Sequence, residues 1–368
     1  MTKLLFLIHD LGYGGAEKVL VNLANNLDKT KYDVTIQTLF DVGENRQFLS
    51  DDVHYIGGLK KIFRGNAPLM RSVPAKLLTK MVIKEKYDIV IAFLEGPDTR
   101  IVSAYPGKKI AWVHTDFADV NQAVAQYRSY DEMCKCYNSF DIVACVAKKV
   151  KEKFNSLLEL KVPCQVVYNV NDTNSIVKKA EEQQTEITKQ EDTVNIISVG
   201  KLIPLKGYDK LIRIHKKLLE EGLNNCLYIL GEGPEHQKLQ NIIDENELQN
   251  SCKLLGFNEN PYKFVKNADL FVCSSEREGF STAVTEALVL GIPVVSTNVS
   301  GANELLGDNN EYGIVTDIDE DSLYKGVYSM LTEDSLLEYY KKQAEIRGKE
   351  FSTEKTTKTV EEILESIV

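Results

Sequence analysis

A pair of glutamates with seven residues between them is the most chemically informative feature of the sequence, within residues 274–288 (SSEREGFSTAVTEAL). Gly279 ends a turn and Ser281 or Thr282 can cap a helix, and the apolar run that follows predicts a buried helix. Glu286 falls inside that helix, where a carboxylate is costly unless a partner such as a ligand hydroxyl binds it. Glu278 precedes the helix, so the two carboxylates could hold two ends of one ligand. The alternative is a capping acid together with a paired core acid.

Two lysines five residues apart lie in the loop GKLIPLKG, directly after a predicted strand. Lys201 and Lys206 could converge on one anion, because an ammonium group is a compact charge suited to phosphate. The alternative is a pair of solvated surface lysines.

A glycine-rich turn at residues 9–17 (HDLGYGGAE) follows the first predicted strand and opens a helix. Gly14 and Gly15 would let backbone N–H groups approach a phosphate at the helix N-terminus. The pattern is not G-x-G-x-x-G, since Glu17 stands where the third glycine would be, and an ordinary tight turn is the alternative. His114 ends another predicted strand and could bind a ligand or be structural.

All these segments follow short apolar runs that alternate with helical patterns, which predicts an α/β fold with parallel sheets. Ligands of such sheets bind outside the carboxyl ends of the strands. The predicted strands of the first half are Leu4–Ile8, Val34–Thr38, Ile89–Phe93, Ile110–Val113, Ile142–Val146 and Val166–Tyr168. Those of the second half are Val194–Val199, Leu227–Leu230, Lys253–Leu255, Leu270–Cys273, Val294–Ser296 and Ile314–Thr316.

The length of 368 residues predicts two domains. Thr173–Thr193 is polar and is typical of a linker or an exposed helix. We therefore place one domain at residues 1–175 together with 350–368, and the other at 176–349. The last segment, Thr353–Val368, has apolar residues at helical spacing and must pack on another element.

Charge and cysteine content exclude several classes of protein. The net charge is −10, and residues 1–175 carry 23 Lys+Arg against 20 Asp+Glu, so the second half is the acidic one. This argues against a nucleic-acid-binding protein. Seven cysteines without a CxxC pair predict buried thiols in a reducing compartment. With no apolar run of membrane-spanning length and no signal peptide, we expect a cytoplasmic protein.

The E-x7-E segment, the lysine loop and the glycine turn together resemble the retaining glycosyltransferases of family 4, which have the GT-B fold. The resemblance covers nearly the whole chain. It implies two Rossmann-like domains facing each other across a cleft, with the acceptor bound by the first and a nucleotide-sugar donor mostly by the second. It also implies that the final helix crosses back to the first domain.

The resemblance assigns the basic residues and the glycine turn to the diphosphate. Lys201 and Lys206 would neutralise the diphosphate leaving group, and Gly14 and Gly15 would approach the diphosphate or the acceptor. Many members of the family carry arginine where Lys201 stands, so the bidentate grip of a guanidinium is lost there while the charge remains.

The resemblance assigns the remaining residues to the sugar and the nucleoside. His114 would lie near the primary hydroxyl of the donor sugar, Glu278 would hold other hydroxyls of that sugar, and Glu286 would hold the ribose. The catalytic set is then His114, Lys201, Lys206 and Glu278. Other residues expected at the donor site are Gly231, Gly233, Phe257, Gly279, Phe280 and Ser281.

The reaction implied is transfer of a hexosyl or N-acetylhexosaminyl group, with a UDP-sugar as the leading donor, to form an α-glycoside with retention. The leaving phosphate would accept the acceptor proton, so the protein acts mainly by electrostatic stabilisation. We expect no metal and no cofactor, since the nucleotide sugar is a substrate. The sequence Asp317-Ile318-Asp319 is interpreted as a helix cap and not as a metal-binding D-x-D motif.

A stretch without acidic residues, Lys60–Lys84, combines basic and apolar side chains and predicts a basic amphipathic helix from Pro74 onward. Such a helix could lie on anionic lipid at the inner face of the plasma membrane, which would suit a polyprenyl-diphosphate-linked acceptor, as in capsule or O-antigen assembly. The alternative is a solvated helix packed on its domain.

Two other functions remain open at this point. Nucleotide-sugar 2-epimerases share the two-domain architecture but lack the E-x7-E helix, and a non-catalytic protein could keep the nucleotide-sugar site without turnover. Acceptor-dependent release of nucleoside diphosphate distinguishes the three.

Overall fold

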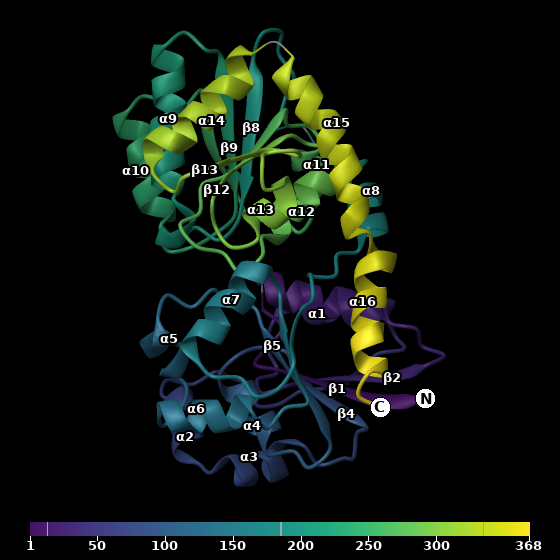
Figure 1. The fold of residues 1–368 in the computed structure, drawn as a ribbon. Helices are drawn as coiled ribbons and strands as arrows, with labels where there is room; N and C mark the ends of the chain where they lie inside the picture. The colour runs from purple at the N-terminus through teal and green to yellow at the C-terminus, as the bar shows by residue number, and fades with distance from the viewer. Residues whose placement is uncertain (13, 185, 334) are drawn as a thin grey trace. The chain divides into compact units, whose positions relative to one another are not determined.

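The structure is a computed structural model that describes residues 1–12, 14–184, 186–333 and 335–368. The chain divides into two compact units (Figure 1). Unit 1 comprises Met1–Asn171 and Thr353–Val368, and unit 2 comprises Asp172–Ser352. Each unit is a parallel β-sheet with helices, so the predicted α/β fold of two Rossmann-like units is confirmed.

The described part of unit 1 contains a seven-stranded sheet of order β3-β2-β1-β4-β5-β6-β7, and all its strand pairs are parallel. Leu4 of the interior strand β1 lies opposite Val34 on one side and Ile89 on the other. The short strand His54–Ile56 was missed from the sequence because none of its residues is fully buried. The strands are β1 (Thr2–Ile8), β2 (Tyr32–Thr38), β3 (His54–Ile56), β4 (Ile89–Ala92), β5 (Lys108–Val113), β6 (Ile142–Cys145) and β7 (Cys164–Val166).

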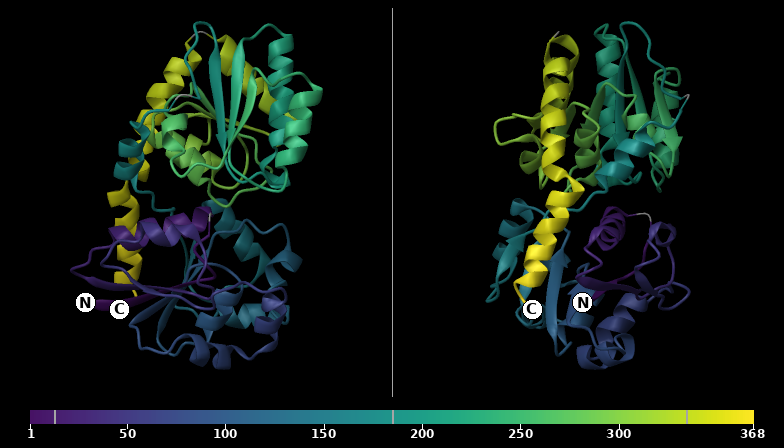
Figure 2. Two further views of the ribbon diagram at one scale, coloured as in Figure 1. Left: turned by 180° about the vertical axis from the view of Figure 1, so that it is seen from behind. Right: turned by 90° about the vertical axis from the view of Figure 1, so that its right-hand side faces the viewer.

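The helices of unit 1 include the C-terminal helix, which packs against α1 (Figure 2). Lys31 Nζ lies 3.0 Å from Glu365 Oε1, and the amide of Asp28 donates to Glu361 Oε1. The predicted return of the chain to the first domain is therefore confirmed. The helices are α1 (Gly15–Asn26), α2 (Asn66–Ser72), α3 (Ala75–Val82), α4 (Pro97–Ser103), α5 (Val120–Val124), α6 (Tyr130–Tyr137), α7 (Lys148–Leu157) and α16 (Thr353–Glu365).

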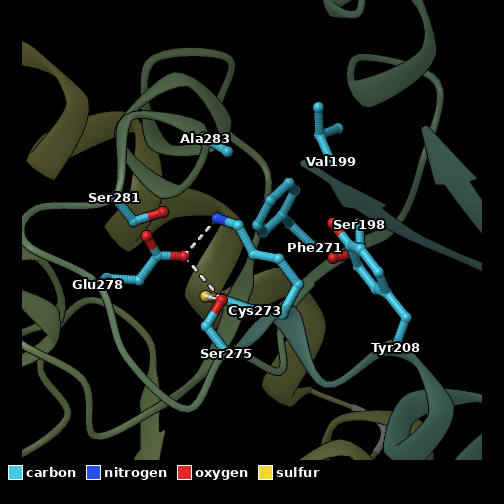
Figure 3. A pocket seen from close by; sticks show the side chains of 10 residues that line it. Ser198, Val199, Tyr208, Phe271, Cys273, Ser275, Glu278, Ser281 and Ala283 are labelled. Carbon is cyan, nitrogen blue, oxygen red and sulfur yellow. Dashed lines mark hydrogen bonds and ion pairs between the residues drawn. The ribbon is translucent and has the colours of Figure 1, made fainter. Parts of the chain in front are cut away.

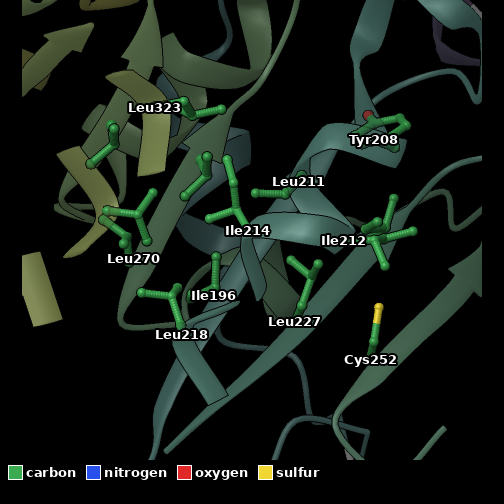
Figure 4. Packing of buried hydrophobic residues seen from close by; sticks show 14 of the residues in the cluster. Ile196, Tyr208, Leu211, Ile212, Ile214, Leu218, Leu227, Cys252, Leu270 and Leu323 are labelled. Atoms are coloured by element: carbon green, nitrogen blue, oxygen red, sulfur yellow. The ribbon is translucent and has the colours of Figure 1, made fainter. Parts of the chain in front are cut away.

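Unit 2 contains, among its described residues, a six-stranded parallel sheet of order β10-β9-β8-β11-β12-β13. Every strand predicted for this half is present. Its buried side chains pack with those of α9 (Tyr208–Glu220) and α14 (Glu320–Thr332) in one core, which includes Ile196, Leu211, Leu270 and Leu323 (Figure 4). The strands are β8 (Val194–Val199), β9 (Asn225–Leu230), β10 (Cys252–Gly256), β11 (Leu270–Cys273), β12 (Val294–Thr297) and β13 (Ile314–Thr316).

The helices of unit 2 correct one prediction. The polar segment after residue 172 begins with α8, and this helix packs on α11 and α12, with Ile176 and Ala180 buried. Two apolar residues four apart give α8 a buried face, so an exposed helix was the wrong interpretation. Asp319 caps α14, as predicted, by accepting a hydrogen bond from the amide of Ser322. The helices are α8 (Thr173–Ala180), α9 (Tyr208–Glu220), α10 (His236–Glu245), α11 (Tyr262–Val265), α12 (Thr282–Val289), α13 (Ala302–Leu306), α14 (Glu320–Thr332) and α15 (Leu336–Gly348).

Candidate functional site

The sheet of unit 2 has a topological switch point between the neighbouring parallel strands β8 and β11. After β8 the chain adds strands toward one edge of the sheet, and after β11 it adds strands toward the other edge. Loops that leave such a point diverge and open a crevice at the carboxyl ends of the strands. A small pocket lies there (Figure 3). Three residues predicted from the sequence line it, together with others that were not predicted. The lining residues are Ser198, Val199, Lys206, Tyr208, Phe271, Cys273, Ser275, Glu278, Ser281 and Ala283.

Glu278 is held in this pocket by two donors on the same carboxylate oxygen. Lys206 Nζ lies 2.6 Å from Glu278 Oε1, and Ser275 Oγ donates to that oxygen at 2.7 Å. The side chains of Lys206 and Glu278 are only 23% and 15% exposed. Burial opposes the charge on Lys206, but the ion pair with Glu278 more than compensates and raises its pKa. No described residue donates to Oε2 of Glu278, so that oxygen can accept a hydrogen bond from a ligand.

Two adjacent serines after β11 tie the loops of the pocket together. Ser274 Oγ donates to the carbonyl of Lys206 at 2.7 Å, while Ser275 binds the Glu278 carboxylate. Thr297 Oγ1 in turn donates to the carbonyl of Ser275. Gly207 has φ +62°, and a Cβ there would lie 2.5 Å from the Ser274 carbonyl oxygen, so the close approach of the two loops requires glycine. The sequence signal for these serines was only their position directly after a strand.

The loop after β8 places its two lysines differently. Lys206 lies in the pocket, whereas Lys201 is exposed and has no partner among the described residues. Gly231 and Gly233, predicted at the donor site, pack against this loop. A Cβ on Gly231 would lie 1.9 Å from the Gly200 carbonyl oxygen, and one on Gly233 would lie 2.3 Å from that of Leu202. This loop-to-loop contact alone is sufficient to require glycine at both positions.

The helix predicted between the two glutamates is present as α12. Ser281 is its N-cap, with Oγ accepting from the amide of Val284. Glu286 is 6% exposed, and Tyr262 Oη donates to its Oε1 at 3.4 Å. Phe280 is buried and contacts the ring of Phe351 at 5.9 Å between centroids. The hydrogen bond from Tyr262 gives the buried Glu286 carboxylate a partner inside the apolar run.

Two further residues predicted at the donor site lie at turns of unit 2. Gly279 is partly buried and directly precedes Phe280 in the turn before α12. Phe257 follows β10, and its ring is 44% exposed. Aromatic side chains can stack on planar ligands.

In unit 1, the glycine turn begins α1, and Gly14 provides no side-chain cap. The Glu17 carboxylate lies against this position, because a Cβ on Gly14 would be 1.8 Å from Glu17 Oε2. The N-terminus of α1, where Gly15 begins the helix, is therefore faced by a carboxylate of the same chain. This arrangement disfavours an additional anion at the turn.

His114 follows β5 and is a neutral imidazole. Its ring lies 4.8 Å from that of Phe93, its Nε2 is buried without a partner among the described residues, and burial lowers its pKa to about 3. Its backbone amide and that of Thr115 donate to Glu95 Oε1 at 2.5 and 2.6 Å. Burial raises the pKa of Glu95 against the effect of these bonds. A neutral imidazole can exchange hydrogen bonds with a hydroxyl group.

The basic stretch of unit 1 presents both charges and apolar side chains to solvent. In α3, Leu78 is buried, whereas Leu77 and Met81 are 50% and 61% exposed. The helix thus packs on its unit through one face and leaves apolar side chains on another. The other exposed large apolar residues of the stretch are Ile62, Phe63 and Leu69, and its exposed basic residues are Lys60, Lys61, Arg64, Arg71, Lys76, Lys80 and Lys84. No helix in the described part of the chain is both long enough and apolar enough to cross a membrane.

Comparison with known proteins gives consistent matches over both units. Residues 13–175 match the family described as Glycosyltransferase Family 4, and residues 179–347 match Glycosyl transferases group 1. A Campylobacter jejuni protein is 29% identical over 95% of this chain and 96% of its own; it is named N-acetylgalactosamine-N,N'-diacetylbacillosaminyl-diphospho-undecaprenol 4-alpha-N-acetylgalactosaminyltransferase. The Rhizobium meliloti lipopolysaccharide core biosynthesis glycosyltransferase LpsE is 22% identical over 88% of this chain and 87% of its own.

Solved structures share the fold over the full chain. Anabaena HepE, in complex with UDP and glucose, superposes with a TM-score of 0.79 at 19% identity, covering 100% of both chains. The trehalose-6-phosphate synthase OtsA superposes with a TM-score of 0.79 at 12% identity, again covering 100% of both chains.

Proposed function

The chain belongs to the GT-B glycosyltransferases of the family 4 type, and from this premise we propose that it transfers a hexosyl or N-acetylhexosaminyl group from a UDP-sugar to a hydroxyl of a lipid-linked glycan. The observation that carries this proposal is the carboxylate of Glu278, which is fixed by Lys206 and Ser275 at the switch point of unit 2. Two names support the choice of substrates: HepE is described with UDP, and the Campylobacter relative is named for a diphospho-undecaprenol acceptor.

In this proposal the donor lies in the pocket of unit 2. Glu278 Oε2 accepts a hydrogen bond from a hydroxyl of the donor sugar, and Glu286 binds the ribose from inside α12. Lys206 holds the Glu278 carboxylate in position and adds a positive charge near the diphosphate. Lys201, which is exposed and unpaired within the described chain, is free to contact the diphosphate directly.

The chemical step needs no strong side-chain base. The bond between the anomeric carbon and the diphosphate oxygen breaks, and the acceptor oxygen forms a bond to that carbon on the same face. The acceptor proton passes to the departing phosphate oxygen. Positive charge from the lysines stabilises the negative charge that develops on the diphosphate, so the reaction proceeds without a metal ion in this proposal.

The acceptor side of the proposal places the protein at a membrane surface. The basic stretch Lys60–Lys84 carries exposed cations beside exposed apolar side chains, a combination that suits anionic lipid. A lipid-linked acceptor is presented at such a surface. We therefore propose a peripheral location at the cytoplasmic face of the membrane, in polysaccharide or glycoconjugate assembly.

Glu278→Gln tests the central assignment. We expect this variant to bind UDP with nearly the affinity of the wild-type protein, measured by isothermal titration calorimetry, and to lose transfer, because the carboxylate contacts the sugar and not the phosphate. Equal loss of UDP binding and transfer would instead indicate a structural role for Glu278.

A further inference from the structure

The sheet of unit 1 has its own switch point, between β1 and β4, and titratable residues that no assignment above uses gather there. His9 and Asp10 directly follow β1, while Glu95 and Asp98 follow β4. The carboxyl ends of these neighbouring parallel strands lie at one edge of the sheet, where a ligand is expected. This edge therefore provides a second candidate binding site, built from unit 1 alone.

His9 is fixed as a hydrogen-bonding group at this edge. Its Nδ1 lies 2.6 Å from Asp10 Oδ2, and the other oxygen of Asp10 accepts from the amide of Gly12 at 2.8 Å. The imidazole also lies 4.9 Å from the ring of Phe40, between centroids. The His9 side chain remains 29% exposed, and no described residue binds its Nε2. Asp10 thus holds the ring through Nδ1, and Nε2 can form a hydrogen bond with a ligand.

The buried carboxylate of Asp98 is a second, independent observation that indicates a binding site here. It is 1% exposed, and neither carboxylate oxygen has a well-oriented hydrogen-bond partner in the described chain, although the amide of His9 lies close enough to favour the charged form. A buried carboxylate without such partners lowers stability. Burial raises the pKa of Asp98 to about 7. The hydrogen bond that His9 donates to Asp10, followed by the charges of Asp98, Asp10 and Glu17, raises the pKa of His9 against the effect of burial.

The charges of the cluster decide the class of ligand. Three carboxylates, those of Asp10, Asp98 and Glu17, act on the His9 imidazole, and a fourth, that of Glu95, acts on Asp98. Glu17 also lies over the N-terminus of α1. A diphosphate would be repelled by these groups. Neutral sugar hydroxyls, in contrast, donate hydrogen bonds to carboxylates and exchange them with imidazole.

We propose that the His9, Asp10 and Asp98 cluster binds the neutral, hydroxyl-rich part of the acceptor glycan and not the diphosphate of its lipid carrier. His9 Nε2 contacts an acceptor hydroxyl, Asp10 orients the ring, and Asp98 acts through His9 as a positioning residue. This inference rests on the proposed function, whose acceptor it describes, and it assigns the acceptor sugar to the carboxyl ends of β1 and β4.

Nuclear magnetic resonance of protein labelled at histidine Cε1 tests the proposal on the complete chain, because the sequence contains five histidines. His9→Asn and His9→Gln identify the His9 signal. We expect N-acetylglucosamine or N-acetylgalactosamine to shift this signal saturably, and inorganic pyrophosphate at matched ionic strength to leave it unchanged. A saturable shift by pyrophosphate, or no shift by either sugar, would overturn the proposal.

The variants separate a positioning role from a general structural one. We expect Asp98→Asn to lower the pKa of His9, and to lower it more than Glu17→Gln does, since Asp98 has the larger effect on His9. An unchanged His9 titration in Asp98→Asn contradicts the role given to Asp98. With an acceptor extract, His9→Asn should raise the KM for acceptor more than His9→Gln, whose amide can replace the outer nitrogen.

UDP binding to the same preparations distinguishes this inference from the proposed function. Retained UDP binding with no effect of the His9 variants on the acceptor KM would reject the acceptor site alone. Absence of UDP binding in the wild-type protein would count against the proposed function, while the sugar titration of His9 would still decide whether unit 1 binds a glycan.

Discussion

The ion pair between Lys206 and Glu278 leads to a quantitative prediction for Lys206→Met, which keeps the apolar stem and removes the charge. Lys206 Nζ and Glu278 Oε1 are 2.6 Å apart in a mostly buried pocket. A hydrogen bond to a charged group in such a site contributes about 1.5–3 kcal/mol. If the same energy stabilises the transition state, in which negative charge develops on the leaving diphosphate, its loss should lower turnover by about 10- to 150-fold. Single-turnover transfer, or donor hydrolysis if the acceptor is unknown, measures this factor.

The controls locate the effect in the reaction and not in folding. Lys201→Met removes an exposed lysine that has no partner in the described chain and is proposed to contact the diphosphate, so it should also reduce turnover while leaving the Glu278 carboxylate held by Lys206 and Ser275. Calorimetric unfolding should show some loss of stability in Lys206→Met, because the mostly buried Glu278 carboxylate then keeps only the hydrogen bond from Ser275, and little change in Lys201→Met. Unchanged turnover in Lys206→Met, or a loss of stability that accounts for the loss of turnover, would refute the assignment of Lys206.

Four further outcomes are expected. Ser275→Ala should lower turnover in the otherwise wild-type protein. In Glu278→Gln it should have no further effect on sugar-dependent donor affinity, because Ser275 acts through the Glu278 carboxylate. Additive effects of the two substitutions would contradict this. Reversing the charge of three lysines of the basic stretch should release the protein from anionic vesicles at low salt, since each contributes about 1 kcal/mol to binding, whereas the three control reversals named below should not. EDTA should leave turnover unchanged, and strong inhibition would reveal a required metal. Burial raises the pKa of Asp98 from 3.8 to about 7, so the folded protein binds this proton more tightly than the unfolded chain does. The free energy of unfolding of the wild-type protein should therefore fall as the pH rises from 3.8 to about 7. Asp98→Asn should remove this loss of stability, which amounts to at most about 4 kcal/mol. Urea unfolding followed by fluorescence of the single tryptophan measures it, and an equal pH dependence of stability in both proteins would refute the prediction. The reversed lysines are Lys76, Lys80 and Lys84, and the controls on α15 and after it are Lys341, Lys342 and Lys349.

The parts of the fold that could be predicted from the sequence are those with local signals. The strands around the site are short apolar runs, and α12 has a capping serine followed by an apolar segment, so β8, β11 and α12 were all predicted at nearly their observed positions. The strand β3 and the buried face of α8 were missed because each has too few apolar residues to give a pattern.

The pairings inside the sites could not be predicted, because they join residues distant in the sequence. Lys206 and Glu278 are 72 positions apart, and only the order of strands in the sheet brings their loops together. The same holds for His9 and Asp98, which belong to the ends of β1 and β4. Ser275 gave no signal beyond its place after a strand. The roles carried over from the resemblance for His114, Lys201 and Glu286 stay predictions.

The measurement that tests the central claim most directly is nucleoside-diphosphate release from a panel of UDP-, GDP- and ADP-sugars, with and without an extract of lipid-linked glycans, followed by determination of the anomeric configuration of the product. The account predicts that a UDP-sugar gives acceptor-dependent release of UDP and an α-glycoside, and that Glu278→Gln gives neither. Formation of an epimerised sugar with UDP in the absence of acceptor would identify an epimerase, and tight donor binding without turnover would identify a binding protein. Either result would contradict the assignment of this chain as a sugar-transferring enzyme.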